Sequence, residues 1–179
     1  TTTRKIHQVI RSKPTIEGAG VHLHRAFGSA RDARLFDPFL LLDDFRSDSP
    51  QDYAPGFPQH PHRGIETITY VLKGTVAHAD SLGNSGEIHG GDVQWMTGGG
   101  GIRHQEMPRG DEQGRMYGFQ LWANLPKVNK MMDPRYQEIT SAEIPTVTLD
   151  DDVLVRIICG EVSGVRGPAE NIIINPQFL

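Results

Sequence analysis

The sequence predicts an all-β protein, built as a sandwich or a barrel, and three features of the chain support this prediction. Short segments that alternate apolar and polar residues, or that are rich in β-branched and aromatic residues, recur along the chain. Clusters rich in glycine and asparagine separate these segments at fairly regular intervals. Only residues 126–132 have the character of a helical turn, with Pro126 suited to its first position. Many short strands separated by turns are typical of sandwiches and barrels.

In the first third of the chain, alternating patterns predict strands over residues 5–11 and 21–27, with a turn at the glycines of 18–20. Residues 38–44 form an apolar run that begins at a proline and ends in two aspartates. This pattern is typical of a buried strand that runs to the surface. Residues 46–59 are polar and rich in proline and glycine, so we expect a loop there.

The rest of the chain continues this pattern. Residues 65–72 form the clearest strand, because they are dense in β-branched and aromatic side chains. Further strands are predicted at residues 75–80, 92–97, 115–124, 138–147 and 153–159, with turns at 73–74, 82–86 and 98–101. Residues 172–174 and 178–179 are apolar, and we expect this last segment to pair back onto the sheet, because an unpaired apolar edge promotes aggregation.

The composition limits the class of protein. A chain of 179 residues, 37% of them hydrophobic and 22% charged, fits one globular domain with a sizeable core. No apolar run has the length of a membrane span, and Cys159, the only cysteine, excludes an internal disulfide. The net charge of −4 argues against direct binding to nucleic acid, which requires a basic surface. We expect a cytoplasmic protein, or a nuclear one if the source is eukaryotic.

Two pairs of metal-binding residue types bracket the central β pattern. His60 and His62 form the first pair, and His104 and Glu106 form the second. Residues i and i+2 of a strand point to the same face, so two neighbouring strands can aim all four side chains at one point. Three neutral imidazoles and one carboxylate suit iron, nickel, cobalt, manganese or zinc better than calcium or magnesium. The sequence therefore predicts a metal site with these four ligands.

Other residues of similar type have simpler interpretations. His22 and His24 also form an i, i+2 pair, but no second pair accompanies them, so we expect ordinary strand histidines. The glycines at 98–101 are not followed by the Lys-Ser/Thr of a phosphate loop, which favours a tight turn passing near the metal. Cys159 lies in an apolar strand and is expected to be a small buried hydrophobe.

Two groups of large side chains are predicted to contribute to packing. Phe119, Leu121 and Trp122 have the chemistry to line the mouth of a barrel, but packing in the core is the favoured interpretation. Met131 and Met132 are expected only to pack against their neighbours.

Four motifs in the chain are long and specific. They are HPHRGIET at residues 60–67, DSLGN at 80–84, GDVQWMT at 91–97 and HQEMP at 104–108, with support from FLLLDDF at 39–45 and YGFQLWANLP at 117–126. Together they resemble the pirin family of the cupin superfamily over nearly the whole chain. The resemblance implies a cupin-type β-barrel, that is, a double-stranded β-helix or jelly roll, with a mononuclear non-haem Fe(2+). By motif position, the family's ligands fall on His60, His62, His104 and Glu106.

The resemblance also implies a division into domains. Pirin-like proteins usually contain two barrels, and this chain would supply the N-terminal barrel over residues 1–170. Residues 171–179 are then either the start of a missing second barrel or a strand that pairs back onto the first. Glu66 lies where many cupins carry a carboxylate ligand, but the pirin pattern uses Glu106. We therefore expect Glu66 either to support the metal ligands by contacting them without binding the metal itself, or to pair with Arg63.

The predicted site leads to two functional hypotheses. Four protein ligands leave an octahedral ion two positions for water, dioxygen or substrate, and a local charge of about +1 that attracts anionic oxygens. The first hypothesis, which the resemblance implies, is quercetin (flavonol) 2,3-dioxygenase activity, in which Glu106 or a nearby carboxylate takes the proton of the substrate hydroxyl. The alternative is a non-catalytic, iron-dependent regulator that binds a transcription factor or a metabolic enzyme.

Overall fold

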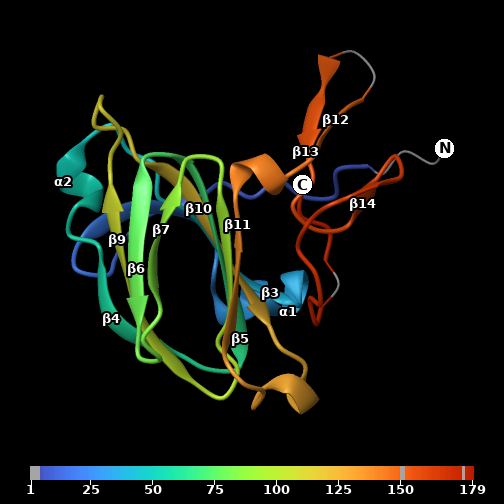
Figure 1. The fold of residues 1–179 in the computed structure, drawn as a ribbon, viewed down its shortest axis with the longest axis horizontal. Coiled ribbons are helices and arrows are strands. Elements are labelled where there is room, and N and C mark those ends of the chain that lie inside the picture. The colour runs from blue at the N-terminus through green and yellow to red at the C-terminus, as the bar shows by residue number, and fades with distance from the viewer. Residues whose placement is uncertain (1–4, 150–151, 175) are drawn as a thin grey trace.

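The computed structural model describes residues 5–149, 152–174 and 176–179, and its main body consists of two antiparallel sheets (Figure 1). The larger sheet has seven strands, in the order β1 (Lys13–Glu17), β2 (Val21–Phe27), β3 (Phe39–Asp44), β10 (Tyr117–Asn124), β5 (Ile65–Lys73), β8 (Val93–Thr97) and β11 (Arg135–Ile139). The smaller sheet has four strands, in the order β4 (Phe57–His62), β9 (Ile102–Arg109), β6 (Thr75–Asp80) and β7 (Ser85–His89).

The two sheets face one another and enclose an interior. Figure 1 shows β9, β6 and β7 side by side in front of the strands of the larger sheet. Thr69 of β5 donates a hydrogen bond across the interior to Glu106 of β9, at 2.9 Å. An apolar cluster also joins the sheets, with Val71 from β5, Val76 from β6 and Ile88 from β7. This arrangement confirms the predicted all-β fold, a cupin-type barrel.

The opposite face of the larger sheet carries a second apolar core. Because side chains alternate along a strand, Ile68 of β5 and Trp95 of β8 point away from the barrel interior. On this outer face they pack with Ile158 and Cys159. Phe178 reaches the same core through a two-way backbone bridge with Cys159, whose hydrogen bonds are 2.9 and 3.0 Å long. The end of the chain therefore covers one face of the sheet. Its assignment to a second barrel stays a prediction.

Replacing Trp95 by alanine is expected to lower the free energy of unfolding by about 3–5 kcal/mol, because the indole is 1% exposed and its removal leaves a cavity in this outer core. Urea unfolding of the variant and the wild type measures this difference. Leu82→Ala, at a side chain that is 59% exposed, is the control and should change little. A loss below about 1 kcal/mol in Trp95→Ala would contradict the packing described here.

Short helices and ribbons connect and flank the strands. The helix α1 (Ala30–Phe36) begins at a capping box, in which Ser29 and Asp32 exchange backbone and side-chain hydrogen bonds. The remaining elements are α2 (Pro50–Tyr53), η1 (Lys127–Asn129), η2 (Ser141–Glu143), β12 (Thr146–Thr148), β13 (Leu154–Arg156), β14 (Glu161–Val162) and β15 (Val165–Arg166). Among the described residues, no helix is long and apolar enough to cross a membrane.

Several predicted boundaries are wrong. Residues 5–11 are exposed and form no strand, because an alternating segment needs a partner strand to form a hydrogen-bonded ladder. The first strand among the described residues is β1. The predicted strand at 138–147 divides into β11, η2 and β12, since a capping box starts a 3-10 turn there. The expected turn at 82–86 ends early, because β7 starts at Ser85 and pairs with β6. The expected loop at 46–59 contains α2 and the start of β4.

Candidate metal centre

The four predicted ligands lie on two paired strands of the smaller sheet. His60 and His62 belong to β4, and His104 and Glu106 belong to β9. The antiparallel register places His60 directly opposite His104. The ladder shifts between Phe57 and His60, so a local irregularity immediately precedes the first ligand pair. Strand alternation and this register bring side chains from two distant parts of the sequence to one place in the barrel.

The three histidines form a compact group. Their candidate ligand nitrogens all lie within 4.8 Å of one another. The ring centroid of His104 lies 4.5 Å from that of His60 and 4.9 Å from that of His62. The Nε2 atoms of His60 and His62 are 3.0 Å apart. No other group of three or more His, Cys, Asp and Glu side chains in the described part of the chain converges in this way.

Glu106 lies beside this group and is held by two neighbours. Its Oε2 is 3.9 Å from His104 Nε2, and the residue is 3% exposed. Thr69 donates a 2.9 Å hydrogen bond to Oε1, and the Gln120 amide donates to both carboxylate oxygens, at 3.2 and 3.4 Å. Glu106 does not belong to the group of ligand atoms that all lie within 4.8 Å of one another. Its carboxylate nevertheless lies beside the His104 ring.

Two of the imidazoles, His62 and His104, are held in the neutral form that binds metals. Burial, and then the nearby His104 and His60, lower the pKa of His62 to about 3. Burial also lowers the pKa of His104, although the Glu106 carboxylate opposes this shift. His60 Nδ1 lies 2.9 Å from the Pro58 carbonyl oxygen, and donation of its proton there leaves the Nε2 lone pair facing the other rings.

The chemistry of these residues fits a divalent first-row metal ion. Both ring nitrogens of His104 are buried, and neither has a hydrogen-bond partner among the described residues, which is costly unless a ligand occupies one of them. Neutral imidazoles and a carboxylate are ligands that iron, nickel and zinc accept. A partly buried Nε2 pair at 3.0 Å, and a buried third imidazole without a hydrogen-bond partner among the described residues, are therefore consistent with a site built to hold an ion.

Two turns fix the end of β4 that carries His62. The Gly64 amide donates a 2.7 Å hydrogen bond to the Gly99 carbonyl oxygen, and Lys130 Nζ donates to the Gly64 carbonyl oxygen at 2.9 Å. A Cβ atom placed on Gly98 would lie 3.4 Å from His62 Cβ, so the backbone passes directly beside this histidine. The prediction of a tight glycine turn near the site is confirmed.

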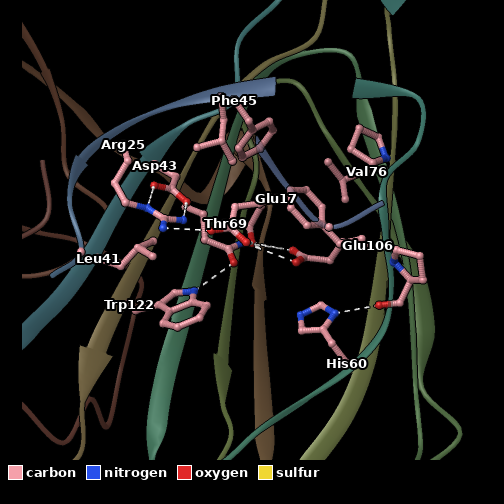
Figure 2. Close-up of a pocket in the computed structure, with 17 residues that line it drawn as sticks. Glu17, Arg25, Leu41, Asp43, Phe45, His60, Thr69, Val76, Glu106 and Trp122 are labelled. Atoms are coloured by element: carbon pink, nitrogen blue, oxygen red, sulfur yellow. Dashed lines mark hydrogen bonds and ion pairs between the residues drawn. The ribbon is translucent and has the colours of Figure 1, made fainter. Parts of the chain in front are cut away.

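A cavity of about 550 Å³ adjoins the histidines and is lined mostly by apolar side chains. His60 and Glu106 lie on one side of it, as Figure 2 shows, and Trp122 lies on its wall. Trp122 Nε1 donates to Gln120 Oε1 at 3.1 Å, which continues the hydrogen-bonded chain to Glu106. The volume is in the range of cavities that bind small molecules.

Comparison with known proteins identifies the family. The sequence profile described as Pirin matches residues 20–123 of the 179. This chain belongs to the pirin family. A pirin-like protein of Caulobacter vibrioides is 49% identical to it over 166 residues, which make up 92% of this chain and 59% of that protein.

Solved structures agree with the family assignment. A crystal structure of quercetin 2,3-dioxygenase from Acinetobacter baumannii superimposes with a TM-score of 0.79 at 37% identity, covering 89% of this chain and 58% of that one. A bacterial pirin from Escherichia coli in complex with nickel(II) has a TM-score of 0.57 at 29% identity, covering 77% and 60% of the two chains. This pirin-family chain spans between 49% and 59% of the length of the curated relatives described as similar to it.

Two sequence predictions near the site are wrong. Glu66 neither supports the histidines nor pairs with Arg63, because it lies on the outer face of β5, where Thr97 Oγ1 donates to it at 2.8 Å. Arg63 instead contacts the sulfur of Met131, so this methionine does meet a neighbour, as predicted, although it is 63% exposed. Thr69 of β5 faces Glu106, and residues an odd number of positions away from it lie on the opposite face of the strand. Strand alternation counted from Thr69 would therefore have placed Glu66 on the outer face.

The prediction for Trp122 is wrong, whereas those for Leu121, the histidine pair of β2 and Cys159 are confirmed. Trp122 lines the cavity and its ring meets that of His62 at a centroid distance of 5.0 Å, so its favoured assignment to the core was wrong, whereas Leu121 does lie in the outer core. His22 and His24 are exposed strand histidines, as predicted. Cys159 is buried, as predicted.

Sequence reasoning missed the two residues that hold Glu106. Thr69 and Gln120 are polar residues in the middle of their strands, and both belong to the interior face of the larger sheet. A buried threonine or glutamine on that face requires a hydrogen-bond partner, and this was the available signal.

The stability of the metal-free protein should depend on pH through His62. The unfolded chain takes up a proton on this residue near pH 6.5, whereas the folded protein does so only near pH 3. In this window the unfolded state binds more protons, so stability falls as the pH falls. From pH 7 to pH 5 we expect His62 alone to lower the free energy of unfolding by roughly 2 kcal/mol.

Urea unfolding at pH 7 and pH 5, in the presence of a chelator, measures this effect. His62→Gln removes the titrating group, so its loss of stability over the same interval should be smaller. An equal loss in the variant and the wild type would show that His62 does not contribute.

Proposed function

We propose that this chain binds Fe(2+) through His60, His62, His104 and Glu106 and supports quercetin 2,3-dioxygenase activity on flavonols. The observation that carries the proposal is a group of three converging imidazoles, two of them buried and one of these without any hydrogen-bond partner in the described structure, beside a largely apolar cavity. The ion would supply a Lewis acid for the substrate oxygens and access to dioxygen chemistry. Two similar structures support the proposal. One is a quercetin 2,3-dioxygenase, and the other is a bacterial pirin in complex with nickel(II).

Residues of the chain account for substrate binding and proton transfer. A flavonol carries a 3-hydroxyl beside a 4-keto group, and Glu106 is the carboxylate next to the histidines that takes the hydroxyl proton. Thr69 and Gln120 keep the Glu106 carboxylate in place through three hydrogen bonds. Trp122 and the other apolar side chains of the cavity exclude water and contact the flat rings of the substrate.

The test is quercetin-dependent oxygen uptake by anaerobically iron-loaded protein, with the chelated protein as the control. Uptake that requires iron supports the proposal. Because the chain is shorter than its relatives, the assay is repeated with the full-length form of a relative. Uptake by neither protein, at stoichiometric iron, would overturn the proposal. Parallel loading with nickel, manganese and zinc identifies the metal that supports the fastest turnover.

A second candidate function is supported by apolar side chains that are exposed close to the site. Val128 and Met131 are 90% and 63% exposed on the segment whose Lys130 binds Gly64, two residues after His62. An iron-dependent regulator would use such a surface to bind a protein partner. The test compares partner binding by iron-loaded protein, chelated protein and a Val128→Asp variant. Binding that neither chelation nor the substitution weakens would overturn this function.

A further inference from the structure

An ion-pair cluster lines the side of the cavity opposite the candidate metal ligands. Arg25 donates to the Asp43 carboxylate through two hydrogen bonds of 2.8 Å, from Nε and Nη2. Arg25 Nη1 lies 2.9 Å from the Glu17 carboxylate. Figure 2 shows Arg25 and Asp43 on one side of the cavity and His60 and Glu106 on the other. The three residues come from neighbouring strands β1, β2 and β3.

The Arg25–Asp43 pair of this cluster is largely buried, and its burial requires an explanation. The Asp43 side chain is 8% exposed and that of Arg25 is 24% exposed. Burial raises the pKa of Asp43, against the opposing effect of Arg25. Removing two charges from water costs energy that their attraction often only balances, so an apolar pair of similar volume would be about as stable here. A buried ion pair on a cavity wall is therefore better explained by recognition than by stability.

The cluster lines the cavity and retains unused hydrogen-bonding groups. A guanidinium has five N–H donors, and the contacts to Asp43 and Glu17 use three of them. The carboxylate oxygens also keep free lone pairs, because each accepts more than one hydrogen bond. One cation and two anions leave a net charge of −1. Such a group attracts neutral hydroxyls, which both donate and accept, and repels carboxylates and sulfates.

We propose that Arg25, Asp43 and Glu17 form a second recognition subsite that binds the adjacent hydroxyls of a catechol-type ring. This inference rests on the proposed function, since the other end of the same substrate would lie at the histidines and Glu106. One phenolic O–H donates to the Asp43 carboxylate, and a phenolic oxygen accepts a free N–H of Arg25. Apolar side chains that include Leu23, Leu41 and Phe45 line the same cavity and contact the rings between the two polar ends.

The residue next to Asp43 provides a matched control. Asp44 follows it on β3, but its carboxylate binds the more exposed Arg46, at 2.8 Å, and does not line the cavity. Asp43→Asn and Asp44→Asn therefore remove the same charge from adjacent positions. Only the first changes the proposed subsite.

The experiment measures the affinity of iron-loaded protein for galangin, kaempferol and quercetin by calorimetry under anaerobic conditions, where no turnover occurs. These flavonols share two rings and carry zero, one and two hydroxyls on the third. The wild type and Asp44→Asn should bind quercetin at least about tenfold more tightly than galangin, because a hydrogen bond to a charged group is worth about that factor. In Asp43→Asn the three affinities should converge.

The outcomes separate the subsite from the enzymatic proposal. Equal affinity of the wild type for all three flavonols would overturn the subsite, whether or not quercetin is consumed in air. Ranked affinities without oxygen consumption would support the subsite and count against turnover alone. Binding of none of the three would overturn both. If Asp43→Asn does not fold, Glu17→Gln replaces it, because that side chain is 44% exposed and its substitution should still reduce the ranking.

Discussion

Replacing His104 by alanine is expected to abolish iron binding and, with it, quercetin-dependent oxygen uptake. His104 is 1% exposed and its ring lies against both other imidazoles, so it is the most deeply buried member of the group. Changes to residues that merely support a metal ligand typically weaken metal binding by about 10–100-fold, so the loss of a ligand should exceed that range. Iron content after gel filtration and titration with Fe(2+) under anaerobic conditions measure the effect.

His24→Ala is the matched control for this prediction. His24 also belongs to an i, i+2 histidine pair on a strand, but it is exposed and does not line the cavity. It should bind iron and consume oxygen as the wild type does. Circular dichroism shows whether His104→Ala keeps its β structure, since removal of a buried ring also leaves a cavity. A folded His104→Ala protein with full iron content would refute the assignment of this ligand.

The convergence of the three candidate histidines was the most predictable feature of the site, because the spacing that produces it is local. The i, i+2 spacing of His60 and His62, and of His104 and Glu106, requires only that each segment be extended. The pairing of the two segments was then the simplest way to bring four ligands together. The structure adds the register that sets His60 opposite His104. That register depends on long-range contacts, which the sequence of one strand does not contain.

The faces of the larger sheet were less predictable, because both are buried. Where one face of a strand meets solvent, alternation of apolar and polar residues reveals its orientation. On β5 the polar Thr69 faces the barrel and the polar Glu66 faces the outer core, so polarity alone does not separate the two sides. Trp122 was misassigned for the same reason. Its large apolar ring suits a core and a substrate cavity equally well.

The ion-pair subsite was not predictable from spacing. Arg25 and Asp43 are 18 residues apart, and they meet because β2 and β3 are adjacent in the sheet with these two residues opposite one another. In the sequence, Asp43 looked like the polar end of a buried strand that reaches the surface. In the structure it is 5% exposed. Only the closure of the barrel places it on a cavity wall.

Replacing Glu106 by glutamine is expected to weaken iron binding by about 10–100-fold and to reduce turnover at saturating iron by a further factor of about 100 or more. Glutamine has nearly the same size but lacks the charge and the capacity to take a proton. Its amide NH₂ would also face the Gln120 amide, which now donates to both Glu106 oxygens, so at least one of these hydrogen bonds is lost. Oxygen uptake is measured against iron added up to saturation.

This titration distinguishes two roles of Glu106. If Glu106 only holds the metal, saturating iron restores the turnover of Glu106→Gln, and its proposed role as a proton acceptor is refuted. If Glu106 also takes the substrate proton, turnover stays low when the site is full. Thr69→Val keeps the carboxylate but removes one of its donors, so saturating iron should largely restore its activity. Glu87→Gln, at an exposed carboxylate on β7, controls for the loss of charge alone.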